Sequence, residues 1–269
     1  MKTLYVSDLD GTLLRRNQHT SQYTNDTINR LVEEEGMIFS YATARSFVTS
    51  HKAAGFTARF PVITYNGAAI IDNADGHIIT KTVFGDEIRQ MLWDLISQDI
   101  YPLVYAYRDG VERFSFIEDK CSPEAKAFIK KRVDERALPV CTEGELLQGD
   151  IFYVSCMGYD EKLPHFYEKY KGQFRCLLQR DIYTNAMWFE TMQKNVKKSA
   201  AVLQLKEMLG CDRVVAFGDG LNDLDMFGVA DECYAVANAE GVVKLRATAV
   251  IGSNDEDGVA HWLEENFKG

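Results

Sequence analysis

This chain has no C-x-x-C pair, and its six cysteines are scattered widely along 269 residues. Neither a zinc site nor a disulfide framework is therefore expected. No apolar run approaches the length of a membrane span. Ser7 and Asp8 interrupt the N-terminal apolar run too early for a signal peptide. We expect a soluble, cytoplasmic protein whose cysteines are reduced.

The sequence also lacks an excess of basic residues. Thirty lysines and arginines are outnumbered by forty aspartates and glutamates, which gives a formal net charge of −10. Binding to nucleic acid or to an anionic membrane needs a basic face, so neither partner is expected. Internal repeats and low-complexity segments are absent too. The 46% of hydrophobic residues is ordinary for a globular protein with a real core.

The common nucleotide-binding motifs are missing. No G-x-x-x-x-G-K-[ST] string occurs, so a Walker-type site is not expected. The segment GDGLND at residues 218–223 begins like a dinucleotide-binding fingerprint, but it ends in Asp where close helix packing requires Gly or Ala. A fixed carboxylate would also repel a pyrophosphate there. A local site for a small phosphate is still compatible with this composition.

The most informative segment that is present lies at the start of the chain. The short apolar run of residues 4–7 leads directly into DLDGT at residues 8–12. Two carboxylates one residue apart repel each other unless a cation or a proton balances them. The pair suits a Mg²⁺ site in which one carboxylate is also a nucleophile, although Asp-Gly is equally a hairpin-turn signal. A calcium loop starting here fails, because it would require Asp or Asn, Gly and Glu at positions held by Thr12, Leu13 and His19.

The order of elements indicates an α/β fold. Strand-like runs at residues 4–7 and 37–42 are separated by a helical pattern that Gly36 ends, which implies parallel strands. The middle of the chain alternates paired strands with single helices, as in an α+β unit with an antiparallel sheet. We predict a doubly wound, mainly parallel sheet with an inserted α+β domain. The core would comprise residues 1–82 and 188–269, and the inserted domain residues 83–187.

Polar groups follow the predicted parallel strands of the core. Two carboxylates follow the first strand, and a hydroxyl and an acidic segment follow two others, as Asp8, Asp10, Thr43 and residues 218–223. Ligands of such sheets bind beyond the carboxyl ends of the strands, so these groups are expected to converge. Each also has a simpler interpretation: a lone Thr is more often a turn residue, and the lysine pair 197–198 is more often a solvated helix face. Together they form a complete set for phosphoryl transfer.

With these residues the chain resembles a haloacid-dehalogenase-superfamily phosphatase of the Cof type, essentially from end to end. DLDGT matches the first family motif and GDGLND the fourth. Thr43 fits the second motif, usually Ala-Thr-Gly-Arg, with Ala44 in place of glycine. Lys198 aligns best with the third-motif lysine, although Ser199 stands where the family usually has glycine. Lys197 is the competing candidate for that lysine.

The resemblance implies a Rossmannoid core, a type C2B cap and a role for each site residue. Asp8 would be the nucleophile and Asp10 the general acid/base. Mg²⁺ would bind side-chain oxygens of Asp8 and Asp219 and the backbone carbonyl of Asp10, with Asp223 in support. The phosphoryl oxygens would be held by backbone groups near Leu9 and Ala44 and by the side chains of Thr43, Lys198 and Asn222.

We therefore expect a Mg²⁺-dependent phosphatase of small phosphorylated metabolites that acts through an aspartyl-phosphate. Sugar phosphates are the leading substrate class by resemblance, and a monomer or weak homo-oligomer is expected. The cap is expected to exclude bulk water and to supply the contacts to the leaving group.

Several alternatives stay open at this stage. Cofactor phosphates such as pyridoxal phosphate or flavin mononucleotide are the next substrate class. A phosphomutase or phosphotransferase would share every core motif, and a non-catalytic phosphate-sensing protein would belong to a different class. A second near-match to a calcium loop, at residues 253–264, reads better as a strand-to-helix turn with acidic N-terminal charges.

Overall fold

The computed structural model describes residues 1–132, 134–180 and 184–268, and the chain divides into two compact units. The first unit comprises Met1–Lys81 and Val196–Gly269, and the second comprises Thr82–Asn195. Each unit has its own sheet and its own cluster of buried apolar side chains.

The first unit is built on an eight-stranded sheet in the order β14-β13-β12-β1-β2-β3-β4-β5. The strands from β14 to β3 pair in parallel, and β3, β4 and β5 form antiparallel pairs at one edge. Their bounds are β1 (Thr3–Asp8), β2 (Ile38–Ala42), β3 (Pro61–Thr64), β4 (Ala69–Asp72), β5 (Ile78–Lys81), β12 (Arg213–Gly218), β13 (Glu232–Val236) and β14 (Ala249–Ile251).

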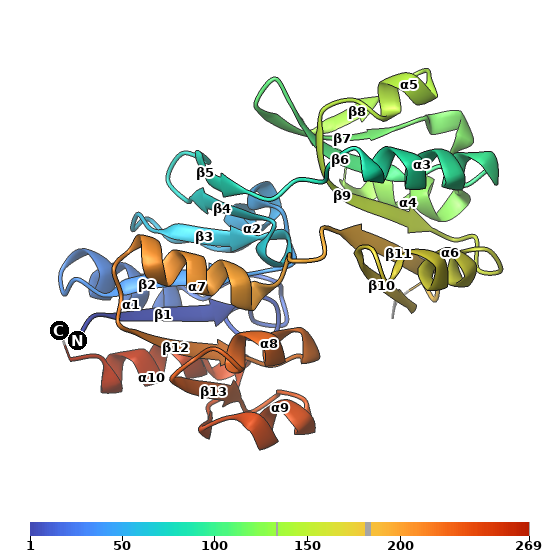
Figure 1. Ribbon diagram of the computed structural model, residues 1–269. Coiled ribbons are helices and arrows are strands. Elements are labelled where there is room, and N and C mark those ends of the chain that lie inside the picture. Colours follow the sequence, from blue (N-terminus) through green and yellow to red (C-terminus); the bar gives the residue numbers. More distant parts are fainter. Residues whose placement is uncertain (133, 181–183, 269) are drawn as a thin grey trace. The chain divides into compact units, whose positions relative to one another are not determined.

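Helices cover this sheet, and Figure 1 shows α7 crossing one of its faces. Helix α7 packs against β3, β4 and α8, and α1 packs against α10. The helices are α1 (Gln22–Glu33), α2 (Phe47–Ala53), α7 (Lys198–Met208), α8 (Leu224–Phe227), α9 (Gly241–Arg246) and α10 (Gly258–Asn266), with 3₁₀ turns η1 (Tyr65–Gly67), η3 (Leu221–Asp223) and η4 (Asn254–Glu256).

The strand register decides where the polar residues of the core meet. In the parallel pairing of β1 with β2, Asp8 lies opposite Ala42, so Thr43 follows directly beside it. In the pairing of β1 with β12, Ser7 lies opposite Phe217, so the loop that begins at Gly218 leaves the sheet beside Asp8. Three loops therefore leave the same edge of the sheet from adjacent strands, which is where α/β sheets bind ligands.

The second unit contains a six-stranded sheet in the order β10-β11-β9-β6-β7-β8. Its strands are β6 (Leu103–Arg108), β7 (Val111–Phe116), β8 (Ala137–Pro139), β9 (Asp150–Met157), β10 (Arg175–Arg180) and β11 (Met187–Met192). Its helices are α3 (Glu87–Ser97), α4 (Pro123–Arg132), α5 (Glu143–Leu146) and α6 (Leu163–Tyr170), with a 3₁₀ turn η2 (Glu118–Lys120).

The predicted fold class, a doubly wound and mainly parallel core with an inserted α+β domain, is confirmed. Two details of the prediction need correction. The second sheet is not purely antiparallel, because the short β8 pairs with β7 in parallel. The predicted inserted domain ends at residue 187, whereas β11 pairs with β9 and β10, so the second unit of the structure continues to Asn195.

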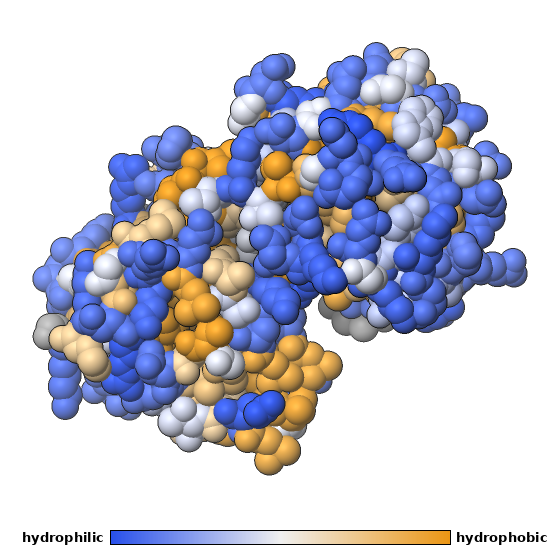
Figure 2. All heavy atoms as spheres, viewed as in Figure 1, coloured by the Kyte–Doolittle hydropathy of each residue, from blue (hydrophilic) through white to orange (hydrophobic). Residues whose placement is uncertain are grey.

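The surface is mainly polar, with apolar side chains exposed on part of the first unit. Figure 2 shows apolar surface over α8 and α9, and Leu221, Val242 and Leu245 are among the exposed large apolar residues there. The expected oligomeric state stays a prediction. No helix in the described ranges is long and apolar enough to cross a membrane.

Substitution of Gly67 would test how closely the β3–β4 connection packs against the start of α7. Its φ is +103°, and a Cβ added there would overlap the carbonyl oxygen of Lys197. We expect Gly67→Ala to lose more than the roughly 1–2 kcal/mol that a positive φ alone costs an L-residue. Gly36→Ala is the matched control, because Gly36 also has a positive φ of +75° but open space around a Cβ. Equal losses for the two variants in urea denaturation would contradict this packing.

Candidate active site

Three carboxylates gather where β1 and β12 end. Asp8, Asp219 and Asp223 each place one carboxylate oxygen within 4.8 Å of the others. Asp8 and Asp223 are buried, and Asp219 is half-buried. The parallel pairing of β1 and β12 explains the cluster, because Asp8 ends one strand and Asp219 follows the end of the other.

The ammonium group of Lys198 lies within this cluster. Lys198 is only 1% exposed, and its Nζ donates to Asp8 Oδ1 and, at 2.8 Å, to Asp223 Oδ1. The neighbouring Lys197 is exposed, and its side chain contacts no hydrogen-bonding or ionic partner among the described residues. Of the two lysines that the sequence left open, Lys198 is therefore the one that lies at the carboxylates.

Asp223 uses both of its carboxylate oxygens inside the protein. Oδ1 accepts from Lys198, and Oδ2 accepts from the backbone N–H groups of Asp219 and Gly220, both at 3.0 Å. Gly218 lies so close that an added Cβ would be 2.7 Å from the side chain of Asp223. Asp223 therefore holds the loop that carries Asp219 and fixes the lysine at the same time.

The loop after β1 is held against Asp219 from the other side. Thr12 donates its hydroxyl to Asp219 Oδ1 at 3.1 Å, and Gly11 has a φ of +77°. A Cβ on Gly11 would overlap the carboxylate of Asp219, so this turn needs glycine for both conformation and space. In the sequence, Thr12 is recognisable only as the last residue of the DLDGT motif, with no predicted partner. Its contact with Asp219 depends on how the two loops meet, which no local pattern reveals.

Asp10 lies in a different environment from Asp8. Its side chain is 50% exposed. The guanidinium of Arg45 donates to both carboxylate oxygens of Asp10 at 2.5–3.0 Å and forms a bidentate ion pair. Thr43 is buried, and its hydroxyl accepts the backbone N–H of Arg45 at 3.0 Å. Arg45 thus links the loop after β2 to the loop after β1, a link that the sequence did not predict.

The remaining predicted phosphate-binding residues lie in the same loops. Leu9 is fully buried, and its carbonyl accepts the N–H groups of Leu13 and Leu14 at 3.1 and 2.8 Å. Ala44 is exposed in the loop that follows β2, and Asn222 is exposed in η3, which follows β12. All of the predicted site residues therefore lie at one edge of the sheet, on loops that follow β1, β2 and β12 or on the first turn of α7.

Burial and mutual repulsion shift the acid–base properties of the cluster. Burial, followed by the charge of Asp223, raises the pKa of Asp8 well above its ordinary value, and Lys198 opposes this shift. Burial and Asp223 also raise the pKa of Asp219 to about 6. Burial alone would lower the pKa of Lys198, but Asp8 and Asp223 outweigh it and raise that pKa, so the lysine stays an ammonium.

The donor set fits a hard divalent cation. Three carboxylates and one ammonium leave two negative charges in a largely buried site, which is the charge that one Mg²⁺ would balance. Among these carboxylates, Asp8 Oδ2 and Asp219 Oδ2 accept no hydrogen bond from the described part of the protein, whereas both oxygens of Asp223 do. Asp8 and Asp219 are therefore the carboxylates available to a metal.

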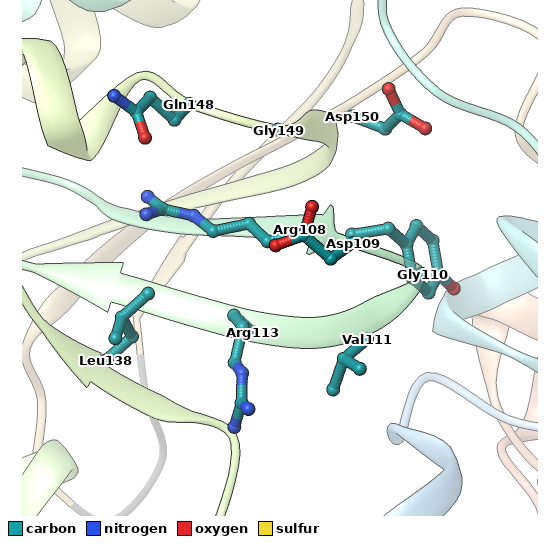
Figure 3. A pocket seen from close by; sticks show the side chains of 10 residues that line it. Arg108, Asp109, Gly110, Val111, Arg113, Leu138, Gln148, Gly149 and Asp150 are labelled. Carbon is teal, nitrogen blue, oxygen red and sulfur yellow. The ribbon is translucent and has the colours of Figure 1, made fainter.

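The second unit contains a cavity of about 730 Å³ at the β6–β7 turn and the segment before β9 (Figure 3). Arg108 and Arg113 line it. Arg108 donates to the carbonyl of Glu145 at 2.5 Å, and Arg113 donates to that of Glu135. Figure 3 shows the two guanidinium groups pointing in different directions, so they do not form one anion-binding pair.

The C-terminal acidic segment is a turn stabilised by ion pairs. Asp255 pairs with Arg16, and Asp257 pairs with Arg15. Glu264 accepts from Tyr23 and Arg30. These carboxylates are spread over separate partners and lead into α10, so this geometry disfavours a calcium loop at residues 253–264.

Comparison with known proteins identifies relatives along the whole chain. The family described as haloacid dehalogenase-like hydrolases matches residues 5–263. A protein of Bacillus subtilis named 5-amino-6-(5-phospho-D-ribitylamino)uracil phosphatase is 27% identical over 297 residues, covering 100% of this chain and 99% of its own length.

Solved structures agree with the fold. The crystal structure of TM0651 from Thermotoga maritima has a TM-score of 0.81 at 24% identity and covers 100% of this chain and 99% of its own. A structure described as the subclass IIB sugar phosphatase BT4131 has a TM-score of 0.68 at 19% identity, and covers 98% of each chain.

The raised pKa of Asp219 predicts a stability effect in metal-free buffer. The fold favours the protonated acid, so stability should fall as pH rises from about 4, near its ordinary pKa, through about 6. Asp219→Asn removes the cost of ionisation. In EDTA at pH 7.5 it should melt about 2–4 °C above the parent. Glu33→Gln, at an exposed position of α1, is the charge-matched control. A lower melting temperature for Asp219→Asn than for Glu33→Gln would contradict the analysis.

Proposed function

This chain belongs to the haloacid dehalogenase-like hydrolase family, and on that premise we propose that it is a Mg²⁺-dependent phosphatase of small phosphorylated metabolites. The reaction would pass through an aspartyl-phosphate on Asp8. The observation that carries the proposal is the buried contact of Lys198 with Asp8 and Asp223. This contact supports the proposal because it brings the carboxylate of Asp8, a cation and an anchored carboxylate together where three loops meet.

In the first step a carboxylate oxygen of Asp8 attacks phosphorus, and the bond from phosphorus to the leaving oxygen breaks. Asp10 gives its proton to that oxygen. In the second step Asp10, now a carboxylate, takes a proton from water. The water oxygen attacks phosphorus and releases the carboxylate of Asp8 together with inorganic phosphate.

The surrounding groups supply charge and position. Lys198 and the side chains of Thr43 and Asn222, with backbone N–H groups near Leu9 and Ala44, would hold the phosphoryl oxygens. Asp8 and Asp219, with the backbone carbonyl of Asp10, would hold Mg²⁺. When bound, the ion would neutralise the carboxylates and polarise the phosphoryl group.

The ion pair with Arg45 bears on the proton transfers of Asp10. Arg45 donates to both carboxylate oxygens of Asp10, so neither oxygen is free to pass a proton to the leaving group while this ion pair is formed. The first step needs the protonated form, so we infer that this contact opens while the leaving oxygen takes its proton. The exposure of Asp10 gives it access to solvent for that exchange.

Sugar phosphates remain the proposed substrate class. The name of the structural relative BT4131 supports it, and the name of the Bacillus subtilis relative specifies a phosphate on a ribityl chain. Both names describe a phosphate carried by a polyhydroxylated carbon chain. A phosphoribityl compound is therefore the second candidate, ahead of pyridoxal phosphate. We place the reaction in the cytoplasm, in keeping with six free cysteines.

A substrate panel with and without Mg²⁺ tests the nucleophile and the metal together. The panel holds hexose phosphates, a 5-phosphoribityl compound, flavin mononucleotide and pyridoxal phosphate. We expect Mg²⁺-dependent release of inorganic phosphate, and a loss of about 10³-fold or more in Asp8→Asn. Asp119→Asn, a charge-matched change at an exposed residue of η2, should keep full activity.

The outcomes of this panel separate the alternatives. If the Asp8→Asn variant kept full Mg²⁺-dependent activity, Asp8 could not be the nucleophile. Isomerised phosphosugar without free phosphate would indicate a mutase. No turnover of any substrate, nor of a generic aryl phosphate, would favour a phosphate-sensing protein.

Asp10→Asn should separate the two chemical steps. An aryl phosphate has a good leaving group that needs little protonation, so Asp8 should still attack it. Hydrolysis of the aspartyl-phosphate lacks its base, so we expect a burst of about one equivalent of phenol, then turnover slowed about 10²–10⁴-fold. Rapid-quench or stopped-flow measurement would detect the burst. Slow turnover with no burst would mean that Asp10 is required before the first step ends.

A further inference from the structure

We propose that Ser199 and Asp225 are positioning residues, which hold the first turn of α7 so that the ammonium of Lys198 stays between Asp8 and Asp223. The inference rests on the role proposed for Lys198 and adds two residues that touch neither the phosphoryl group nor the metal. It follows from the contacts at the start of α7.

Helix α7 begins without a local cap. Its N-cap residue is Lys197, whose side chain makes no capping hydrogen bond, and its first residue is Lys198 itself. The first N–H groups of a helix lack partners within the helix and need them from elsewhere. A loosely held first turn would let the lysine move, because its charge sits at the end of a flexible four-carbon stem.

Asp225 supplies the missing partner from another element. Its Oδ2 accepts the hydroxyl of Ser199 at 3.2 Å and lies 3.5 Å from the backbone nitrogen of the same residue. A carboxylate at a helix N-terminus is also favoured by the helix dipole. Asp225 therefore restrains Ser199, the residue next to Lys198, through both its hydroxyl and its backbone N–H.

The partner belongs to the segment that already carries the acidic cluster. Asp225 lies in α8, which follows the loop of Asp219 and Asp223 without a break. The two segments are therefore joined twice, once by Lys198 to Asp223 and once by Ser199 to Asp225. Two neighbouring hydrogen bonds restrain the position and the orientation of the first turn of α7 more closely than either would alone.

Asp225 directs its hydrogen bonds to the start of α7. Its second oxygen, Oδ1, is buried and has no hydrogen-bond partner within the described residues. The contacts with Ser199 are therefore the hydrogen bonds that this carboxylate accepts in the described part of the protein. On the opposite side, Gly67 approaches the carbonyl of Lys197 closely enough to exclude any side chain. The start of α7 is thus held from two directions.

Steady-state kinetics with an aryl phosphate and Mg²⁺ tests the proposal. We expect Asp225→Ala to lower kcat about tenfold while KM changes less than about twofold, because a displaced group weakens the transition state more than binding. Ser199→Ala should lower kcat by about threefold. Asp225→Asn and Ser199→Thr keep an acceptor and a hydroxyl, so each should retain more than about half of the activity. Gln204→Ala, at an exposed site on α7, is the control.

A double-mutant cycle distinguishes positioning from general loss of structure. If Asp225 acts through Lys198, Asp225→Ala should change the residual activity of Lys198→Gln by less than about twofold. The same tenfold loss in that background would overturn the proposal, and so would unchanged kcat in both Asp225→Ala and Ser199→Ala. Full activity of Lys198→Gln by itself would instead contradict the proposed function. If Asp225→Ala does not fold, the same cycle is measured with Ser199→Ala.

Discussion

The candidate site in the first unit depends on one electrostatic constraint, the gathering of three carboxylates, two of them buried, near a single buried ammonium. Asp8 and Asp223 have almost no exposed surface, and neither does Lys198. Uncompensated charges in such a place cost several kcal/mol each. The cluster is tolerable only if every charge has a fixed partner and the remaining negative charge is available to a cation. The neighbouring loops meet that requirement.

The fold produces this cluster of charges because it brings segments that are distant in the sequence to one edge of the eight-stranded sheet. Asp8 and Asp219 are far apart in the sequence, but parallel pairing of β1 and β12 puts the ends of their strands side by side. Glycines then allow close approach: Gly11 faces Asp219, and Gly218 faces Asp223. The backbone N–H groups at 219 and 220 fix Asp223, which in turn fixes the lysine. The glycines and backbone N–H groups of the loops after β1 and β12 thus accommodate the carboxylates of Asp219 and Asp223.

Much of the site could be predicted from the sequence, because strand order alone dictates which loops meet. Strand order predicts that Asp8, Thr43 and the 218–223 segment converge at one edge of the sheet. It fails where side-chain placement decides the outcome. The ion pair of Arg45 with Asp10 depends on the rotamers of these two side chains. The hydrogen bond of Ser199 to Asp225 depends on how α7 and α8 pack. The parallel pairing of β8 with β7 is not predictable in the same way, because a strand of three residues carries too weak a sequence pattern.

The two aspartates of the first motif show why spacing alone does not assign chemistry. Residues two apart in a strand share a face, so Asp8 and Asp10 would be equivalent if β1 continued. The strand ends at Asp8, and the turn at Gly11 carries Asp10 outward. One carboxylate is thereby buried, which raises its pKa, and lies beside Lys198, which opposes that rise; the other is half-exposed beside Arg45. A buried carboxylate held by a lysine is suited to attack, because water does not shield it. An exposed one, with a partner it can release, is suited to exchange protons. The two environments, and with them the two roles proposed for these aspartates, depend on where a single strand ends.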